Sequence, residues 1–241
     1  MDKKLNDISI SGSGKIAGGE YNSIRISGSG KVTGDVICES LHISGSGKTE
    51  GIEAGEIKAS GSFHASGIVK AEIMHVSGSA HIDGAIEAGE IRISGAFHAN
   101  SAVTGKTVRI SGSMHADSGI EADNVIISGA ARVDGLLNAE TIEIHLNGTS
   151  NISEIGCERI AVKNSGNTGF SLFGLFKINS SRHTLTANSI EATEAYLENT
   201  KCKVVRAKKA IIGVGSEIDR VEYEETIEIH ENAVVKEQIR I

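Results

Sequence analysis

Four histidines, His64, His81, His98 and His115, follow one another at a constant interval of 17 residues. Imidazole is a common ligand of Zn²⁺, so histidines brought side by side in space could bind a metal ion through neighbouring pairs. The same place in neighbouring segments holds Lys or Arg, which are not ordinary zinc ligands. We therefore interpret the series as a solvated basic face, with contact to an acidic surface such as anionic lipid as an alternative. We call it the basic ladder: Lys15, Lys31, Lys48, His64, His81, His98, His115 and Arg132.

The regular interval comes from a Ser-Gly dipeptide that stands at the equivalent place in eight successive units, with spacings of 16 or 17 residues. The pairs are Ser11-Gly12, Ser27-Gly28, Ser44-Gly45, Ser60-Gly61, Ser77-Gly78, Ser94-Gly95, Ser111-Gly112 and Ser128-Gly129. Each unit has the pattern apolar-x-apolar-Ser-Gly-small-x-x-apolar-x-Gly, as in IRISGSGKVTG. A fixed short period of this kind is typical of proteins built from stacked repeats.

Apolar residues alternate within each unit, which indicates short strands rather than helices. In one unit the apolar residues stand at odd-numbered positions, Ile91, Ile93, Phe97 and Ala99, and the polar residues stand at the even-numbered positions between them. A chain that turns several corners per unit must pair each strand with its counterpart one turn away. The sequence therefore predicts an all-β parallel β-helix solenoid of about 17 residues per turn. Roughly 13 turns at the strand spacing of about 4.8 Å give a rod about 60 Å long.

A column of small and large apolar residues stands two places after each Ser-Gly glycine, and we expect it to point inward. It reads Gly14, Gly30, Gly47, Phe63, Ala80, Phe97, Met114 and Ala131. The next residue in each unit belongs to the basic ladder, and we expect that column to point outward.

Three segments divide the chain. Residues 1–163 form the repeat β-helix, residues 164–182 form a Phe-rich excursion without strand alternation, and residues 183–241 continue the β-helix. The excursion concentrates apolar side chains among Asn, Ser and Gly, which favours contact with a membrane, a partner or a second copy. A flap folded over the rod is the alternative. The residues concerned are Phe170, Leu172, Phe173, Leu175 and Phe176.

The composition excludes several classes of protein. Glycine occupies 29 positions and proline none, hydrophobic residues make up 39 % and the net charge is −7, which fits neither collagen nor a disordered chain. The chain has no overall basic field, so we expect no nucleic-acid partner. It has no long apolar run, its start lacks the apolar core of a secretory signal, and its three cysteines form no C-x-x-C pair. We expect a cytoplasmic protein whose cysteines are not in disulfides, with association with the inner face of the cell membrane as an alternative.

Catalytic motifs are weak. The triplets Gly47-Lys48-Thr49 and Gly105-Lys106-Thr107 lack the preceding glycine of a phosphate-binding loop. We expect neither an enzyme nor a cofactor or metal site.

The ends of the repeat array are strand-like. The pattern has begun by Ile8 and Ile10 and continues to Ile239 and Ile241, with no capping helix between them and the array. Open strand edges recruit other strands, so we expect these residues to form polymerisation faces. A loosely capped monomer is the alternative.

The iterated I-x-I-S-G-[SA]-x-x-[AV]-x-G turns resemble those of the bactofilins, the polymer-forming cytoskeletal proteins of bacteria. The resemblance implies a right-handed β-helix that polymerises end to end, without nucleotide, into non-polar filaments. It also implies a scaffold for cell shape, wall synthesis or motility, with this chain itself or a related bactofilin paralogue as partner. A non-polymerising β-helix module that presents the basic ladder or the Phe-rich excursion to a partner is the alternative.

Overall fold

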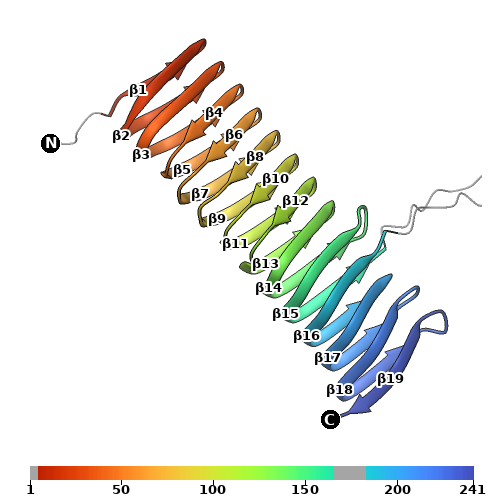
Figure 1. Ribbon diagram of the computed structural model, residues 1–241. Coiled ribbons are helices and arrows are strands. Elements are labelled where there is room, and N and C mark those ends of the chain that lie inside the picture. Colours follow the sequence, from red (N-terminus) through yellow and green to blue (C-terminus); the bar gives the residue numbers. More distant parts are fainter. Residues whose placement is uncertain (1–4, 165–182) are drawn as a thin grey trace, which may run out of the picture.

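The computed structural model describes residues 5–164 and 183–241, and every element in these residues is a β-strand. All 19 strands belong to one continuous sheet in which the pairings are parallel. Figure 1 shows the strands stacked along one rod, from β1 at the N-terminal end to β19 at the C-terminal end. The prediction of an all-β parallel solenoid with about 13 turns of about 17 residues is confirmed. The right-handedness stays a prediction.

The strands are β1 (Asp7–Ile10), β2 (Ser13–Ile26), β3 (Ser29–Ile43), β4 (Ser46–Thr49), β5 (Ile52–Ala59), β6 (Ser62–Ala65), β7 (Val69–Val76), β8 (Ser79–Ile82), β9 (Ile86–Ile93), β10 (Ala96–Ala99), β11 (Val103–Ile110), β12 (Ser113–Ala116), β13 (Ile120–Ile127), β14 (Ala130–His145), β15 (Ser150–Lys163), β16 (Leu185–Leu197), β17 (Thr200–Ile212), β18 (Glu217–Ile229) and β19 (Val234–Arg240). The described residues contain no helix long and apolar enough to cross a membrane.

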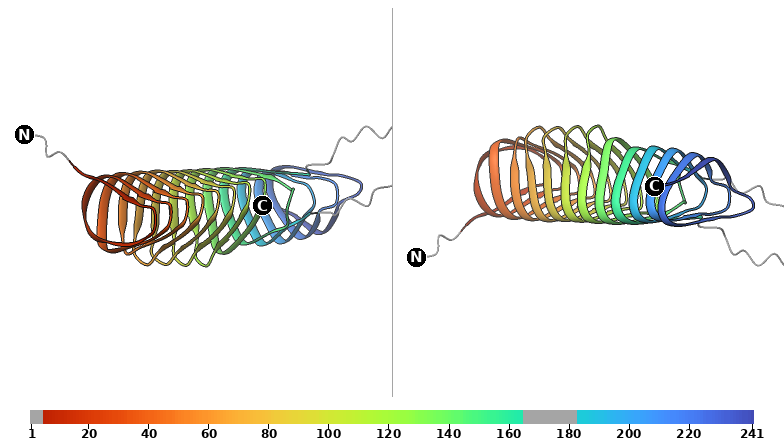
Figure 2. Two further views of the ribbon diagram at one scale, coloured as in Figure 1. Left: turned by 90° about the horizontal axis from the view of Figure 1, so that it is seen from above. Right: turned by 90° about the horizontal axis from the view of Figure 1, so that it is seen from below.

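One turn in the middle of the rod contains a short strand and a longer strand with a bend. β10 pairs with β8 and β12, and β11 pairs with β9 and β13. Within β11 the register skips Lys106, so that the segments on its two sides form separate faces. Each turn therefore has three faces, and Figure 2 shows the turns as loops that follow one another along the rod.

The core includes two columns that stay apolar over the full length of the described rod. The first column has 13 members: Ile8, Ile24, Leu41, Ile57, Met74, Ile91, Val108, Val125, Ile142, Ile160, Ala195, Ala210 and Ile227. The second column begins at Ile10 and ends at Ile229. All members between the two ends are buried, so apolar burial at roughly 25 cal/mol per Å² holds each turn on the next.

The column predicted to point inward does so, and its changes of size are matched by its neighbours. Phe63 is 1 % exposed and Phe97 is 3 % exposed. A Cβ added to Gly47 would lie 2.7 Å from Cδ1 of Ile43, so isoleucine already fills that space. In the next turn Ala59 replaces Ile43 and Phe63 replaces Gly47, which keeps the filled volume similar.

The Ser-Gly pairs form a corner at which successive turns approach very closely. The backbone N–H groups of Ser94 and Gly95 both donate to the carbonyl oxygen of Val76, at 2.8 and 3.2 Å. A Cβ on Gly95 would overlap the carbonyl oxygen of Gly78 in the preceding turn. Only glycine fits at this position, which explains why the dipeptide recurs in every turn up to Gly129.

The Phe-rich excursion is inserted at the same corner. β15 and β16 pair directly, from Ser150↔Leu185 to Val162↔Leu197, so the ladder continues across the insertion. The predicted contact residues Phe170, Leu172, Phe173, Leu175 and Phe176 lie outside the described residues.

We expect Gly95→Ala to destabilise the rod by roughly 3 kcal/mol or more, because its methyl group overlaps backbone that cannot move aside. The matched control is Gly12→Ala in the first turn, where a Cβ would meet nothing within 4 Å. Its effect should stay within about 0.5 kcal/mol. Urea-induced unfolding followed by circular dichroism measures both changes, and equal midpoints would contradict the close approach at the corner.

Candidate functional site

The register places the whole basic ladder in one outward-facing column. Pairings connect Lys15 to Lys31, Lys31 to Lys48, Lys48 to His64, and so on to His115 and Arg132. The lysines and Arg132 are exposed and the four histidines are half-buried. Neighbouring imidazole rings lie close, with centroids 5.4 Å apart for His64 and His81 and 4.7 Å apart for His98 and His115.

A column of carboxylates that the sequence analysis missed runs beside the histidines. Asp83 and Asp117 directly follow β8 and β12, two residues after His81 and His115. Residues i and i+2 of an extended segment point to the same side, so each carboxylate lies beside the ladder. The signal was present in the sequence as His-x-Asp at both places.

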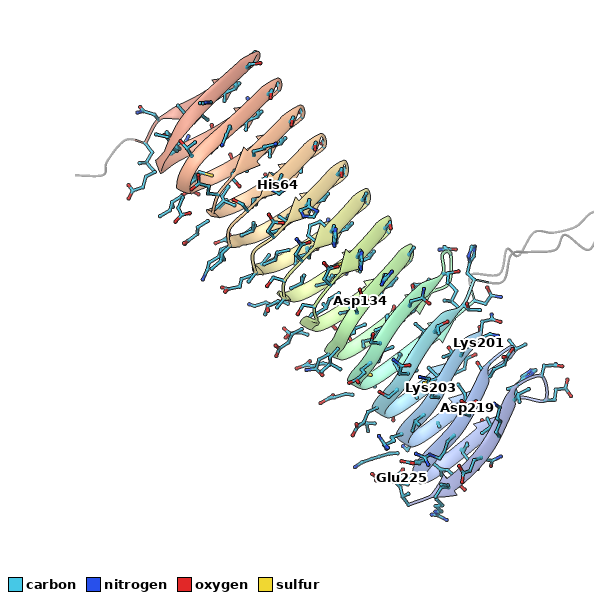
Figure 3. The ribbon with its side chains drawn as sticks, viewed as in Figure 1. His64, Asp134, Lys201, Lys203, Asp219 and Glu225 are labelled. Carbon is cyan, nitrogen blue, oxygen red and sulfur yellow. The ribbon has the colours of Figure 1, made fainter. Side chains whose placement is uncertain are left out.

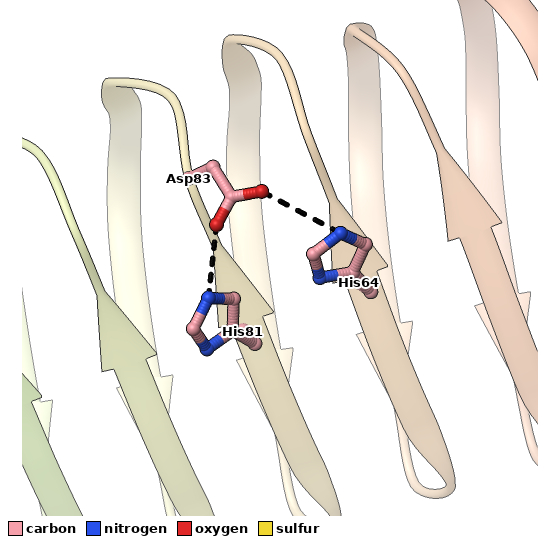
Figure 4. Close-up of side chains that lie close together, drawn as sticks. All are labelled: His64, His81 and Asp83. Carbon is pink, nitrogen blue, oxygen red and sulfur yellow. Dashed lines mark hydrogen bonds and ion pairs between the residues drawn. The ribbon is translucent and has the colours of Figure 1, made fainter.

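Asp83 lies between two imidazoles from neighbouring turns (Figure 4). Its Oδ2 is 3.5 Å from Nε2 of His64, and its Oδ1 is 2.9 Å from Nε2 of His81. Asn100, from the following turn, donates its Nδ2 hydrogen to Oδ1 of Asp83 at 2.9 Å. The carboxylate therefore connects three successive turns.

Asp117 repeats this arrangement two turns further along. Its Oδ1 is 2.8 Å from Nε2 of His98 and 3.2 Å from Nε2 of His115. The two rings are almost parallel, with an interplanar angle of 2°. Both imidazoles thus present the same nitrogen to a single carboxylate oxygen.

Asp134 ends the series by pairing with Arg132. The guanidinium Nε of Arg132 lies 2.9 Å from Oδ1 of Asp134, and Nε2 of His115 lies 3.0 Å from Oδ2. Figure 3 shows His64 and Asp134 along the same face of the rod. Over this stretch the ladder is a mixed His, Asp and Arg surface rather than a purely basic one.

A second set of charges near the C-terminal end pairs between successive turns. Lys201 lies 2.9 Å from Glu217, Arg206 lies 2.6 Å from Glu222, and Lys236 lies 2.8 Å from Asp219. Figure 3 labels Lys201 and Asp219 of this group near the C-terminal end of the rod. Ion pairs at the protein surface contribute little to stability, so this surface adds little to the stacking of the turns.

A shallow groove that the sequence analysis also missed follows a column of small residues on another side of the rod. Ala88, Gly105, Ala122 and Ala139 are consecutive members of this column. Several carboxylates border the groove: Glu39, Glu53, Glu72, Glu87, Glu121, Glu140, Glu154 and Glu191. Gly55, Gly89 and Gly156 also line it, so small residues make up much of its floor.

The three thiols are free, and burial makes them poor nucleophiles. It raises the pKa of Cys38 and of Cys202 to about 11, and that of Cys157 to about 12. The reactive thiolate is therefore scarce at neutral pH.

The rod ends differ in part from the sequence-based expectation. Ile8 is half-buried against the core and Ile10 is buried, while Ile241 is 66 % exposed. Ile239 pairs with Glu222 in an outward column and does not continue the core. The core columns end instead at Ile227 and Ile229, which the sequence analysis did not single out. That these two isoleucines are the last members of their columns becomes apparent only when the strand pairings are traced from one end of the rod to the other.

Comparison with known proteins gives a limited similarity. No family model matches the chain. The chain is 37 % identical over 92 residues to the uncharacterized protein YhbF of Bacillus subtilis (strain 168), which covers 38 % of this chain and 35 % of that protein. The match thus spans about a third of the length of YhbF. No solved structure matches the chain. The protein is a β-solenoid distantly similar to YhbF.

We expect Arg132→Gln to raise the pKa of Asp134. The side-chain hydrogen bond from Arg132, followed by that from His115, lowers this pKa below its ordinary value of 3.8. Because the folded-state pKa is lowered, the stabilising contribution is present above the ordinary pKa and is lost as the pH falls through the folded value. An acid titration of the Asp134 carboxyl carbon by NMR measures the change.

Arg92→Gln is the matched control for that titration. It removes the guanidinium that lowers the pKa of Glu90 by a side-chain hydrogen bond, on another face of the rod. It should raise the pKa of Glu90 and leave that of Asp134 unchanged. A pKa of Asp134 that does not move in Arg132→Gln would show that the ion pair is absent in solution.

Proposed function

We propose that the protein is a self-assembling structural protein whose rods stack end to end into filaments without nucleotide. The observation that carries the proposal is that two of the core columns reach both ends of the described rod as apolar side chains. The first column begins at Ile8 and ends at Ile227, and the second begins at Ile10 and ends at Ile229. The end surface of one rod thus offers the same kind of contact that holds successive turns together.

Exposed atoms at the C-terminal end support this proposal. Ile229 is 36 % exposed, whereas Ile212, its neighbour in the preceding turn, is fully buried. Val235 is only partly buried, whereas Ile218 beside it is 1 % exposed. Covering these side chains with another end surface would gain roughly 25 cal/mol for each Å² of apolar area removed from water.

Unpaired strand edges supply the second part of the contact. Among residues 5–164 and 183–241, β19 pairs only with β18, and β1 pairs only with β2. The free edge of each carries backbone N–H and C=O groups that another strand can bind. Stacking would therefore extend the hydrogen-bonded ladder as well as the apolar core.

The resemblance of the turns to the bactofilins gives the proposal its biological setting. On this basis the filaments would act as a bacterial cytoskeletal scaffold for cell shape, wall synthesis or motility. The partner is a second copy of the chain or a related chain with the same end surface.

The proposal predicts filaments a few nanometres wide in negative-stain electron microscopy of the purified protein. We expect Ile229→Lys to convert them into separate rods about 60 Å long, because stacking would bury an unpaired charge. Combining it with Ile8→Lys places a charge at both ends and should give the same result.

The matched controls are Ile37→Lys and Ile68→Lys. These isoleucines are 53 % and 51 % exposed, on the sides of the rod rather than at its ends, so both variants should keep the filaments. Uniform short rods in the unmodified protein, or filaments of unchanged length in Ile229→Lys, would overturn the proposal. Circular dichroism establishes that each variant is folded.

A further inference from the structure

We propose that the histidine turns hold two binding sites for a divalent transition-metal ion of the Zn²⁺ class. Site one consists of His64, His81 and Asp83, and site two of His98, His115 and Asp117. In each site the three ligand atoms lie within 4.8 Å of one another. Two imidazoles and one carboxylate, with a fourth position open to water, form a ligand set that proteins use for Zn²⁺.

The distances between ligand atoms fit one ion. A tetrahedral ion with ligands at about 2.0–2.1 Å has ligand atoms about 3.3 Å apart. In site two the distances from Oδ1 of Asp117 to the two Nε2 atoms are 2.8 and 3.2 Å. In site one the corresponding distances to the two oxygens of Asp83 are 2.9 and 3.5 Å. The remaining separation in each site, between nitrogen atoms of the two imidazoles, is at most 4.8 Å.

The backbone holds the ligands in place before an ion arrives. The two histidines of each site are register partners on adjacent parallel strands, β6 with β8 and β10 with β12. Each of these strands is also paired on its other side. The free-energy cost of bringing the imidazoles together is therefore met by the fold rather than by metal binding.

The sites recur at two turns, which keeps the two ions apart. Two turns correspond to about 9 to 10 Å, whereas ions in adjacent turns would lie only about 4.8 Å apart and repel strongly. Asn100 occupies the equivalent place in the turn between those of Asp83 and Asp117. A carboxylate there would create a third site between sites one and two. Arg132 ends the series by pairing with Asp134.

The occurrence of Lys and Arg elsewhere in the column does not argue against these sites. The four histidines occupy four consecutive turns, and two aspartates divide them into two pairs. The carboxylates supply the third ligand that a column of histidines alone lacks. Each site with its ion carries a net charge of +1, from one divalent ion and one carboxylate.

Equilibrium dialysis of the chelator-treated 241-residue protein against Zn²⁺, followed by metal analysis, tests the proposal. We expect two ions per chain, falling to one in Asp83→Asn, to one in Asp117→Asn and to none in the double variant. Asn100 occupies the same place in its own turn, so the fold tolerates asparagine there. Replacing Zn²⁺ with Co²⁺ should give the visible absorption of a four-coordinate ion, which the double variant loses.

Two further variants make the outcome decisive. His42→Ala removes an imidazole that lies 3.3 Å from a single carboxylate, that of Glu56, and should still bind two ions. His81→Lys combined with His115→Lys uses the residue found at Lys48 in the same column and should bind none. Fewer than one ion per chain in the unmodified protein, or undiminished binding in either double variant, would overturn the proposal.

Discussion

The close approach of backbone at the Ser-Gly corner determines the rest of the structure. The N–H groups of both corner residues reach one carbonyl of the preceding turn, and the next N–H reaches the preceding glycine carbonyl, as Ala96 does with Gly78 at 2.9 Å. No side chain fits between these groups. Each turn up to Gly129 is therefore held at one height and in one register on the turn before it. Residues at equivalent places become neighbours in space, and columns of like residues are the result.

This constraint explains why so much of the fold could be predicted from the sequence. The spacing of the dipeptides gave the length of a turn, and the alternation around it gave the direction of each side chain. Phe63, Ala80 and Phe97 lie inside and the histidines beside them lie outside, as the pattern predicts. These features depend on local period alone. Turn length and side-chain direction can therefore be predicted without knowing how one column contacts another.

Features that connect different columns could not be found in that way. The aspartates beside the ladder belong to the corner that follows each short strand, and Asp83 reaches His64 in the turn before its own. The hydrophobicity of Ile239 predicts an apolar end surface there, but β18 and β19 pair in one constant register from Glu217↔Val234 to Tyr223↔Arg240. Ile239 consequently meets Glu222, and Ile229 ends the core column. Side-chain reach and the register of the last strands decide such contacts, and neither is visible in a single repeat.

A rod of this kind is one-dimensional, because each turn contacts only the turns before and after it. Its ends are therefore chemically close to its interior interfaces, and adding another rod resembles adding another turn. The outward columns differ from the apolar columns, because like residues stacked at the strand spacing repel one another when all of them are charged. Lys15, Lys31 and Lys48 are stacked in this way. Beside the four histidines, in contrast, a carboxylate lies between the members of each pair. The same register thus leaves the apolar residues of two columns at the rod ends and places the histidines and aspartates of neighbouring turns side by side, and a change in turn length would disturb both.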